Sequence, residues 1–172
     1  MAKYSTGLNS FTPVGTADTT TMTTLTYLGL IGGAATQRTA ISEIYMGGQA
    51  TSSQAMWMVF ARDSTNAATP VAPAAAVGWN GPLDVNSTAL ASPVVAFNTA
   101  TTGPSRATTA TLARLNLSYN AFGGIVRWTA MDPTEWYIIY GTGTSAGEAT
   151  LSAFTGSGAS GVMGCHIIYE TM

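Results

Sequence analysis

A serine and a histidine are the residues best suited to catalysis in this chain. Ser145 stands inside Gly-Thr-Ser-Ala-Gly at 143–147, which fits the nucleophile-elbow pattern of hydrolases, and His166 follows it in the order that such enzymes require. A nucleophile elbow joins a strand to a helix, but here a second strand pattern begins at Glu148. We therefore interpret 143–147 as a hairpin turn and predict no catalytic residues and no enzyme activity, with a hydrolase as the third hypothesis.

The patterns that could bind a cofactor or a metal are weak. Residues 156–161 match the glycine pattern of dinucleotide-binding folds, but no helix pattern follows them, so we interpret them as a flexible loop and predict no cofactor. Cys165 and His166 are the only cysteine and histidine and are adjacent in a strand pattern, so we expect Cys165 in the core and His166 on the opposite face. Asp132 and Glu135 have a proline between them, which favours a turn over a calcium site, and we predict no metal.

Four tryptophans could serve as platforms on which sugar rings stack. Trp57, Trp128 and Trp136 lie inside strand patterns, where large aromatic side chains usually fill the interior of a sandwich, so we favour the core for these three. Trp79 differs because it precedes Asn80 in a segment rich in proline and glycine. It either fastens that segment to the domain or inserts into a pocket of a partner.

Two segments without a strand pattern are candidates for contacts with other molecules. Residues 1–24 are rich in threonine, serine and glycine, and we expect an N-terminal arm that is either disordered or laid along a neighbouring subunit. Residues 63–92 hold several prolines and an Asn-Gly pair, which predicts a long excursion that touches a neighbour instead of a central strand. The partner-contact residues that we predict are Trp79, Asn80, Thr21 and Thr23.

The elements that would position these residues are short strands. Apolar runs separated by glycine, proline, asparagine and serine predict an all-β fold in a single domain over 25–172. The expected strands span 25–31, 39–46, 56–62, 93–97, 111–119, 124–131, 136–140, 148–154 and 162–170. In 111–119 and 124–131 one face is apolar and the other polar, which is typical of half-buried strands. This number of strands without helices favours a jelly-roll-like antiparallel β-sandwich, with a closed barrel as the alternative.

The composition favours assembly with other proteins. Of the 172 residues 46% are hydrophobic and only 8% are charged, whereas a free monomer normally maintains a charged surface. Six lysines and arginines against eight acidic residues argue against nucleic acid as a ligand, and the apolar runs are too short to span a membrane. The first residues lack the apolar core of a secretory signal and the chain has one cysteine, so we expect synthesis in a cytoplasm.

Two parts of the sequence resemble a known family. The sequence ISEIYMGGQAT at 41–51, followed by MWMVFAR at 56–62, resembles a strand end and a tryptophan-containing strand of small virion proteins of tailed bacteriophages. The sequence VRWTA at 126–130, with the strand patterns that follow it to Glu170, resembles the C-terminal half of the same proteins. The similarity covers roughly residues 38–170.

The resemblance implies a capsid decoration or cement protein, folded as a jelly-roll-like sandwich and often a homotrimer on the outer surface of the phage head. Its partners would be its own copies and the major capsid protein. We therefore expect a non-enzymatic virion structural protein, made in the host cytoplasm, that stabilises the capsid through many modest contacts around a symmetric oligomer. The alternative is a tail or fibre module that binds a cell-surface glycan through an exposed tryptophan.

Overall fold

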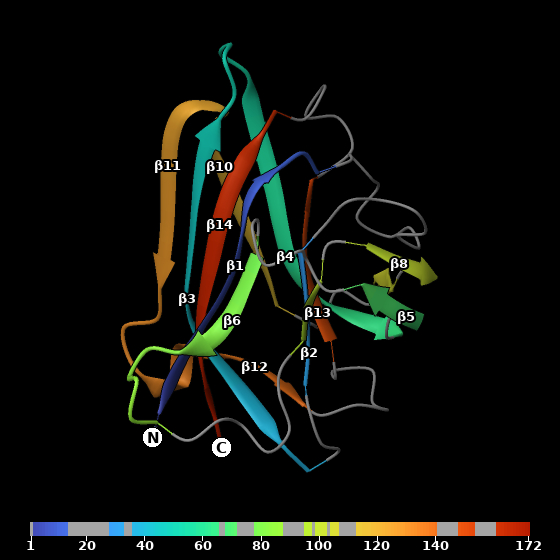
Figure 1. The fold of residues 1–172 in the computed structure, drawn as a ribbon, viewed down its shortest axis with the longest axis vertical. Helices are drawn as coiled ribbons and strands as arrows, with labels where there is room; N and C mark the ends of the chain where they lie inside the picture. The colour runs from blue at the N-terminus through green and yellow to red at the C-terminus, as the bar shows by residue number, and fades with distance from the viewer. Residues whose placement is uncertain are drawn as a thin grey trace.

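In the computed structural model, the chain folds into two antiparallel β-sheets that pack against each other (Figure 1). The structure describes residues 2–13, 28–32, 36–65, 68–71, 78–87, 95–97, 99–102, 104–106, 113–140, 148–153 and 161–172. The first sheet contains β1 (Lys3–Phe11), β3 (Arg38–Gln49), β6 (Gly78–Pro82), β11 (Phe122–Thr129), β12 (Tyr137–Tyr140) and β14 (Met163–Thr171). The second sheet contains β2 (Leu28–Ile31), β4 (Ala55–Thr65), β7 (Val95–Phe97), β9 (Ser105–Arg106), β10 (Arg114–Asn120) and β13 (Glu148–Ala153). A separate strand pair is formed by β5 (Ala68–Val71) and β8 (Thr99–Thr102), and a 3₁₀ turn spans Pro133–Glu135.

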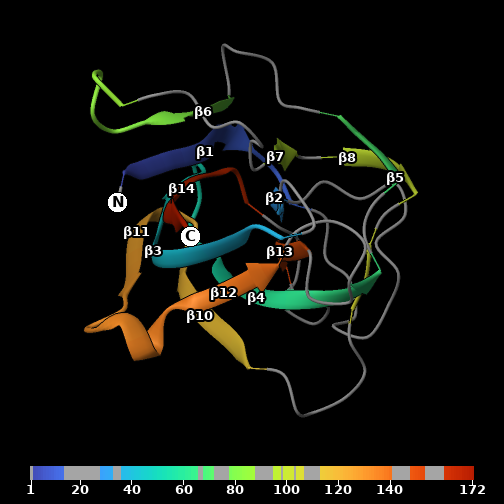
Figure 2. The same cartoon turned by 90° about the horizontal axis from the view of Figure 1, so that it is seen from below.

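The strand order shows how the chain moves between the sheets. It is β11-β3-β14-β1-β6 in the first sheet, where β12 also pairs with β3, and β10-β4-β13-β2-β7 in the second, where β9 also pairs with β4. Figure 2 shows β6, β1, β14 and β3 in succession on one side and β7, β2, β13 and β4 on the other. The all-β antiparallel sandwich predicted from the sequence is confirmed, while the jelly-roll connectivity stays a prediction.

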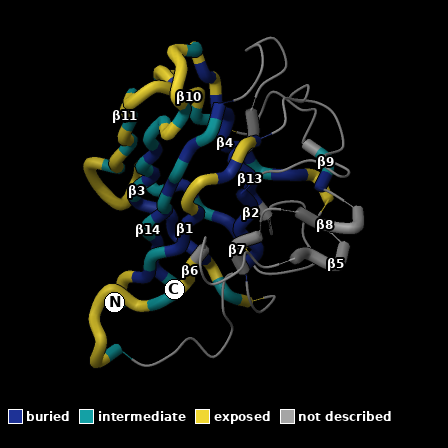
Figure 3. Tube along the Cα trace, turned by 45° about the horizontal axis from the view of Figure 1, so that its top comes forward, coloured by how far each residue is buried: buried dark blue, intermediate teal, exposed yellow. Residues whose placement is uncertain are grey.

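The core lies between the two sheets because the strands direct alternate side chains inward. Figure 3 shows the buried residues gathered along the facing strands and the exposed residues along β11 and at the turns. The largest fully buried side chains are Tyr169, Phe60, Leu8, Leu28, Leu30, Ile41, Ile44 and Met46. Inward and outward positions alternate through β10 and β11 as predicted, with Leu117 buried between exposed Asn116 and Ser118.

The predicted N-terminal arm is wrong for residues 3–11. This segment is strand β1, which lies between β14 and β6 in the first sheet and buries Tyr4, Leu8 and Phe11. Its inward positions also include the polar Thr6, which is fully buried. Because of this threonine the sequence shows no regular apolar alternation in the segment. The remainder of the predicted arm, residues 14–24, lies outside the described residues.

The predicted excursion at 63–92 is also wrong where the structure describes it. Residues 63–65 continue β4, and two further strands, β5 and β6, lie within the segment. Strand β6 pairs with β1 at the edge of the first sheet, and an edge tolerates Pro82 because the missing N–H leaves no internal hydrogen bond unmade. Trp79 and Asn80 therefore belong to an edge strand and not to an irregular loop.

Candidate functional site

A row of side chains crosses the outer face of the first sheet. Gly7 on β1 lies opposite Trp79 on one side and opposite His166 on the other. His166 in turn lies opposite Tyr45 on β3, and Tyr45 opposite Arg127 on β11. Residues that lie between 72 and 159 positions apart in the sequence thus become neighbours across five strands.

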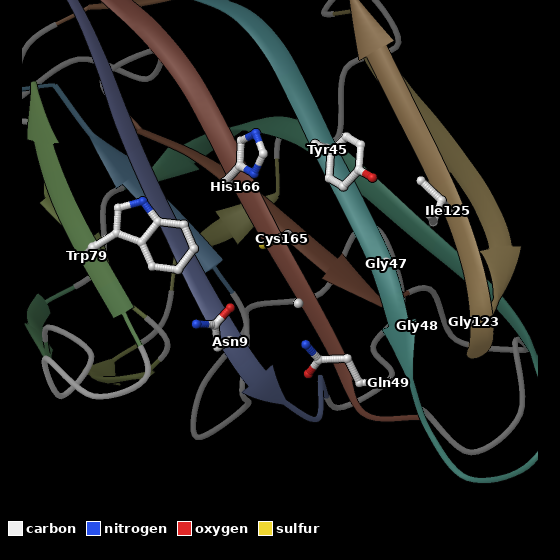
Figure 4. A pocket seen from close by; sticks show the side chains of 11 residues that line it. Asn9, Tyr45, Gly47, Gly48, Gln49, Trp79, Gly123, Ile125, Cys165 and His166 are labelled. Carbon is white, nitrogen blue, oxygen red and sulfur yellow. The ribbon is translucent and has the colours of Figure 1, made fainter. Parts of the chain in front are cut away.

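Beside this row the sheet has glycines in place of side chains. Gly164 on β14 lies opposite Gly47 on β3, which lies opposite Ile125 on β11. Because these glycines have no side chains to cover the backbone, the surface forms a cavity of about 390 Å³. We call it the glycine trough; its lining residues are Asn9, Tyr45, Gly47, Gly48, Gln49, Trp79, Gly123, Ile125, Gly164, Cys165 and His166 (Figure 4).

Trp79 is fixed at one end of the glycine trough. Its backbone carbonyl accepts a hydrogen bond of 2.9 Å from Thr6 Oγ1, and its indole Nε1 donates to Ser5 Oγ at 3.2 Å. The six-membered ring covers Gly7, since a Cβ placed there would lie 2.5 Å from the Cζ2 atom of Trp79. The side chain nevertheless remains 40% exposed, so one part of the ring packs on the sheet while another faces solvent.

Gln49 stands at the opposite border of the trough with its amide held in one orientation. Its Oε1 accepts hydrogen bonds of 3.0 Å from both the backbone N–H and the Oγ of Ser10. Ser10 has a φ of 53°, a left-handed conformation that is uncommon outside glycine and that brings both donors to the same oxygen. The Gln49 Nε2 lies over Gly164, 3.0 Å from the position that a Cβ would take there.

His166 and Tyr45 form a stacked pair at the centre of the row. Their ring centroids are 5.2 Å apart and their planes differ by 12°. Next to them Arg127 makes a bidentate ion pair with Glu43, with Nε to Oε1 at 2.8 Å and Nη2 to Oε2 at 2.9 Å. This pair neutralises the guanidinium charge beside the trough.

Cys165 and His166 lie on opposite faces of β14, as predicted. Cys165 is buried in the core with Met163, Ile167 and Tyr169, and burial raises the pKa of its thiol to about 12. The thiol is therefore protonated at neutral pH and is not a nucleophile. His166 is half-buried on the outer face, where it contacts Tyr45.

A second depression lies on the same sheet where β6 ends. Its volume is about 270 Å³, and we call it the apolar hollow after four of its lining residues, Leu83, Met131, Trp136 and Ile168. Leu83 is 56% and Met131 is 85% exposed, which is unusual for large apolar side chains. The charged residues Lys3, Glu43 and Asp132 also line the hollow. Protein interfaces likewise combine exposed apolar side chains with polar ones.

A short 3₁₀ turn contributes several residues of the apolar hollow. Asp132 caps the 3₁₀ turn Pro133–Glu135. Its Oδ1 accepts hydrogen bonds from the Thr134 hydroxyl at 2.5 Å and from the Thr134 N–H at 2.7 Å, and these lower the pKa of the Asp132 carboxyl. Glu135 Oε2 accepts from the Met131 N–H at 2.7 Å. The predicted turn at Asp132 and Glu135 is thus confirmed, and among the described residues no group of three His, Cys, Asp or Glu could hold a metal ion.

The three tryptophans predicted to lie in the core differ in their burial. Trp57 is 41% exposed on the outer face of the second sheet, so its predicted core position is wrong, because the inward positions of β4 belong to its neighbours Met56 and Met58. Trp128 is partly buried and packs against the core, and Trp136 is half-buried at the apolar hollow. Both faces of β4 are apolar over residues 55–61, so in this strand the periodicity does not show which face turns inward.

The predicted partner-contact residues are only partly described. Trp79 lines the glycine trough. Asn80 is the next residue of β6, so its side chain lies on the opposite face of the sheet. There its Oδ1 accepts a hydrogen bond of 2.6 Å from the hydroxyl of Tyr169. Thr21 and Thr23 lie outside the described residues, as do Ser145 with its 143–147 pattern and residues 156–160 of the second glycine pattern.

Sequence reasoning missed most of the trough. Asn9, Tyr45 and Gln49 received no role, although glycines at 47, 48 and 164 within apolar strands were a usable signal. A glycine inside a strand often marks a place where a ligand or another backbone approaches closely.

Comparison with protein-family profiles, with curated proteins and with solved structures gave no match to this chain. Within the described part of the chain, no helix has the length and apolar character needed to cross a membrane. Any function must therefore be inferred from the surfaces described above.

Proposed function

We propose that the chain is a non-enzymatic structural protein of a tailed-bacteriophage virion. In this proposal it sits on the outer surface of the head as a homotrimer and stabilises the capsid through contacts with its own copies and with the major capsid protein. The jelly-roll connectivity expected from the resemblance belongs to the same proposal. The segments that carry the resemblance correspond to β3, β4 and β11 and to the strands that follow as far as β14, and residues of β3, β11 and β14 line both depressions of the first sheet.

The apolar hollow is the observation that supports this proposal most directly. Leu83 follows β6, where its N–H donates to the Lys3 carbonyl, and Met131 precedes the 3₁₀ turn, and both side chains are exposed. Beyond them Val85 is 91% exposed at the tip of a turn in which Asp84 accepts the N–H groups of Asn86 and Ser87. Covering such side chains with another protein removes apolar surface from water, at about 25 cal/mol for each Å².

The low charge of the chain agrees with this role. Only 8% of the residues are charged, and threonine, serine, alanine and glycine are frequent in the sequence. These side chains allow close approach of a neighbouring subunit without the desolvation of many ions. A symmetric oligomer would repeat each modest contact and gain avidity on a capsid lattice.

The test measures the absolute mass of the purified protein by light scattering over a dilution series. We expect a species near three times 17.7 kDa, which dissociates in L83E and M131E because a carboxylate enters an apolar interface. The control is S118E, since Ser118 is exposed on the second sheet, away from the apolar hollow. The wild-type chain should also co-sediment with undecorated heads of the phage that encodes it. A strict monomer that does not bind these heads contradicts the proposal.

One observation favours the alternative of a tail or fibre module. Trp79 is exposed at a concave site, whereas a purely structural role needs no such cavity. Loss of glycan binding in Trp79→Ala with intact particle attachment would support this alternative, while loss of attachment would support the capsid role.

A further inference from the structure

The glycine trough offers a flat aromatic surface of the kind on which a sugar ring can lie. The Trp79 ring is supported from below by Gly7 and fastened at its indole nitrogen by Ser5, so it needs no rearrangement to receive a ligand. At 40% exposure it leaves ring surface accessible beside the trough. The C–H face of a pyranose is apolar and carries slight positive charge, which complements the negative face of an indole.

The polar groups of the trough suit hydroxyl groups. The Oε1 of Gln49 is occupied by two hydrogen bonds from Ser10, so its Nε2 is directed over the glycine floor as a donor. Asn9 borders the trough between Trp79 and Gln49, as Figure 4 shows, and an amide can both donate and accept. Ser10 holds a left-handed φ to fix this arrangement, and backbone strain of this kind concentrates at binding sites.

The charges around the trough indicate an uncharged ligand. Among the described lining residues there is no Asp, Glu, Lys or Arg, and the nearby Arg127 is paired with Glu43. The volume of about 390 Å³ falls in the range of about 300–1,000 Å³ typical of sites for small ligands. Apart from His166, a phosphate, a carboxylate or an acidic peptide would find no basic side chain among the described lining residues.

From these features we propose that the glycine trough binds a neutral pyranose, either free or as one unit of a glycan, with its C–H face on Trp79 and its hydroxyl groups on Gln49 and Asn9. The alternative function, a glycan-binding tail or fibre module, would use the same site. Sugar binding in the trough does not depend on whether the chain decorates a phage head or forms part of a fibre. Its test is separate from the mass measurement, so one proposal can fail while the other stands.

The experiment is a titration of the ¹⁵N-labelled full chain with three methyl glycosides, those of glucose, galactose and N-acetylglucosamine, at millimolar concentrations. We expect saturable movement of the Trp79 indole N–H signal and of the Gln49 side-chain amide signals with at least one of them. The indole signal is assigned from the spectrum of Trp79→Phe.

Two variants remove the site in different ways. Trp79→Ala takes away the stacking surface, and we expect it to weaken binding about tenfold or more. Gly47→Val fills the floor of the trough and should have a similar effect, although the fold accepts it, because a Cβ at this position meets only the Gly124 carbonyl oxygen at 3.9 Å. The matched control is Trp57→Ala, since Trp57 is 41% exposed but lies on the other sheet.

The expected result is loss of binding in Trp79→Ala and Gly47→Val with affinity within about twofold of wild type in Trp57→Ala. Two results overturn the inference. One is the absence of movement at Trp79 and Gln49 with all three methyl glycosides. The other is a loss in Trp57→Ala as large as that in Trp79→Ala, which would place the contact elsewhere.

Discussion

Replacing Gly7 by alanine tests the close packing of β1 between its two neighbours. A Cβ on Gly7 would overlap the carbonyl oxygen of Cys165 on β14 and would lie 2.5 Å from Cζ2 and 2.8 Å from Cη2 of Trp79 on β6. The backbone oxygen cannot withdraw unless the β1–β14 pairing opens, so the strand is compressed from both sides. Overpacking of this kind costs about 1–3 kcal/mol.

Displacement of the Trp79 ring adds a second contribution. The indole hydrogen bond to Ser5 would be lost, at about 1 kcal/mol, which brings the expected destabilisation by Gly7→Ala to about 2–4 kcal/mol. With a urea dependence of about 2 kcal/mol per molar, the unfolding midpoint should fall by about 1–2 M. The indole N–H signal of Trp79 should move at the same time, because its ring leaves the sheet.

Gly81→Ala is the matched control on the strand next to β1. A Cβ on Gly81 has no atom within 4 Å, and Gly81 is not among the positive-φ glycines, so alanine is accommodated there. We expect unchanged stability or a gain of about 0.4–1 kcal/mol, because alanine reduces the freedom of the unfolded chain. Equal urea midpoints for Gly7→Ala and Gly81→Ala would refute the packing described for β1, β6 and β14.

Further predictions concern buried polar groups. The Tyr137 hydroxyl accepts from the Arg62 N–H at 2.8 Å and donates to the Ala113 carbonyl at 2.6 Å, so Tyr137→Phe should lower the free energy of unfolding by about 1–3 kcal/mol in urea titrations; an unchanged midpoint would contradict this. Burial raises the pKa of the Cys165 thiol to about 12, so a disulfide reagent at pH 8 should label the native protein far more slowly than the urea-unfolded chain. Because this folded-state pKa lies above the value of about 8.5 for an exposed thiol, its contribution to stability is complete below about pH 8 and is lost as the pH rises toward 12. Urea midpoints measured at rising pH should therefore fall less steeply in Cys165→Ala than in the wild-type chain. Burial raises the pKa of Tyr119 and Tyr169 in the same direction, so part of the fall should persist in that variant.

The sequence by itself determined the class of fold and the inward face of several strands. In β10 and β14 apolar residues recur at every second position, and that period matches the pleat, so Leu117 and Cys165 face the core wherever the strands pair. The turn at Asp132 was equally predictable because a proline and a short acidic side chain define it locally. The opposite faces of Cys165 and His166 follow from the same period.

Only the tertiary structure shows that β1 and β6 belong to the first sheet and that the two depressions exist. Residues 3–11 contain too many small and polar side chains to show a period, and only their pairing with β14 and β6 makes them a strand. The buried Asp63, whose Oδ1 accepts from Thr150 Oγ1 at 3.2 Å, likewise has a partner 87 positions away. Gly7, Trp79 and His166 become neighbours through strand order and register. These are set by the burial of the whole domain, because local sequence does not specify which strands, far apart in the chain, will pair.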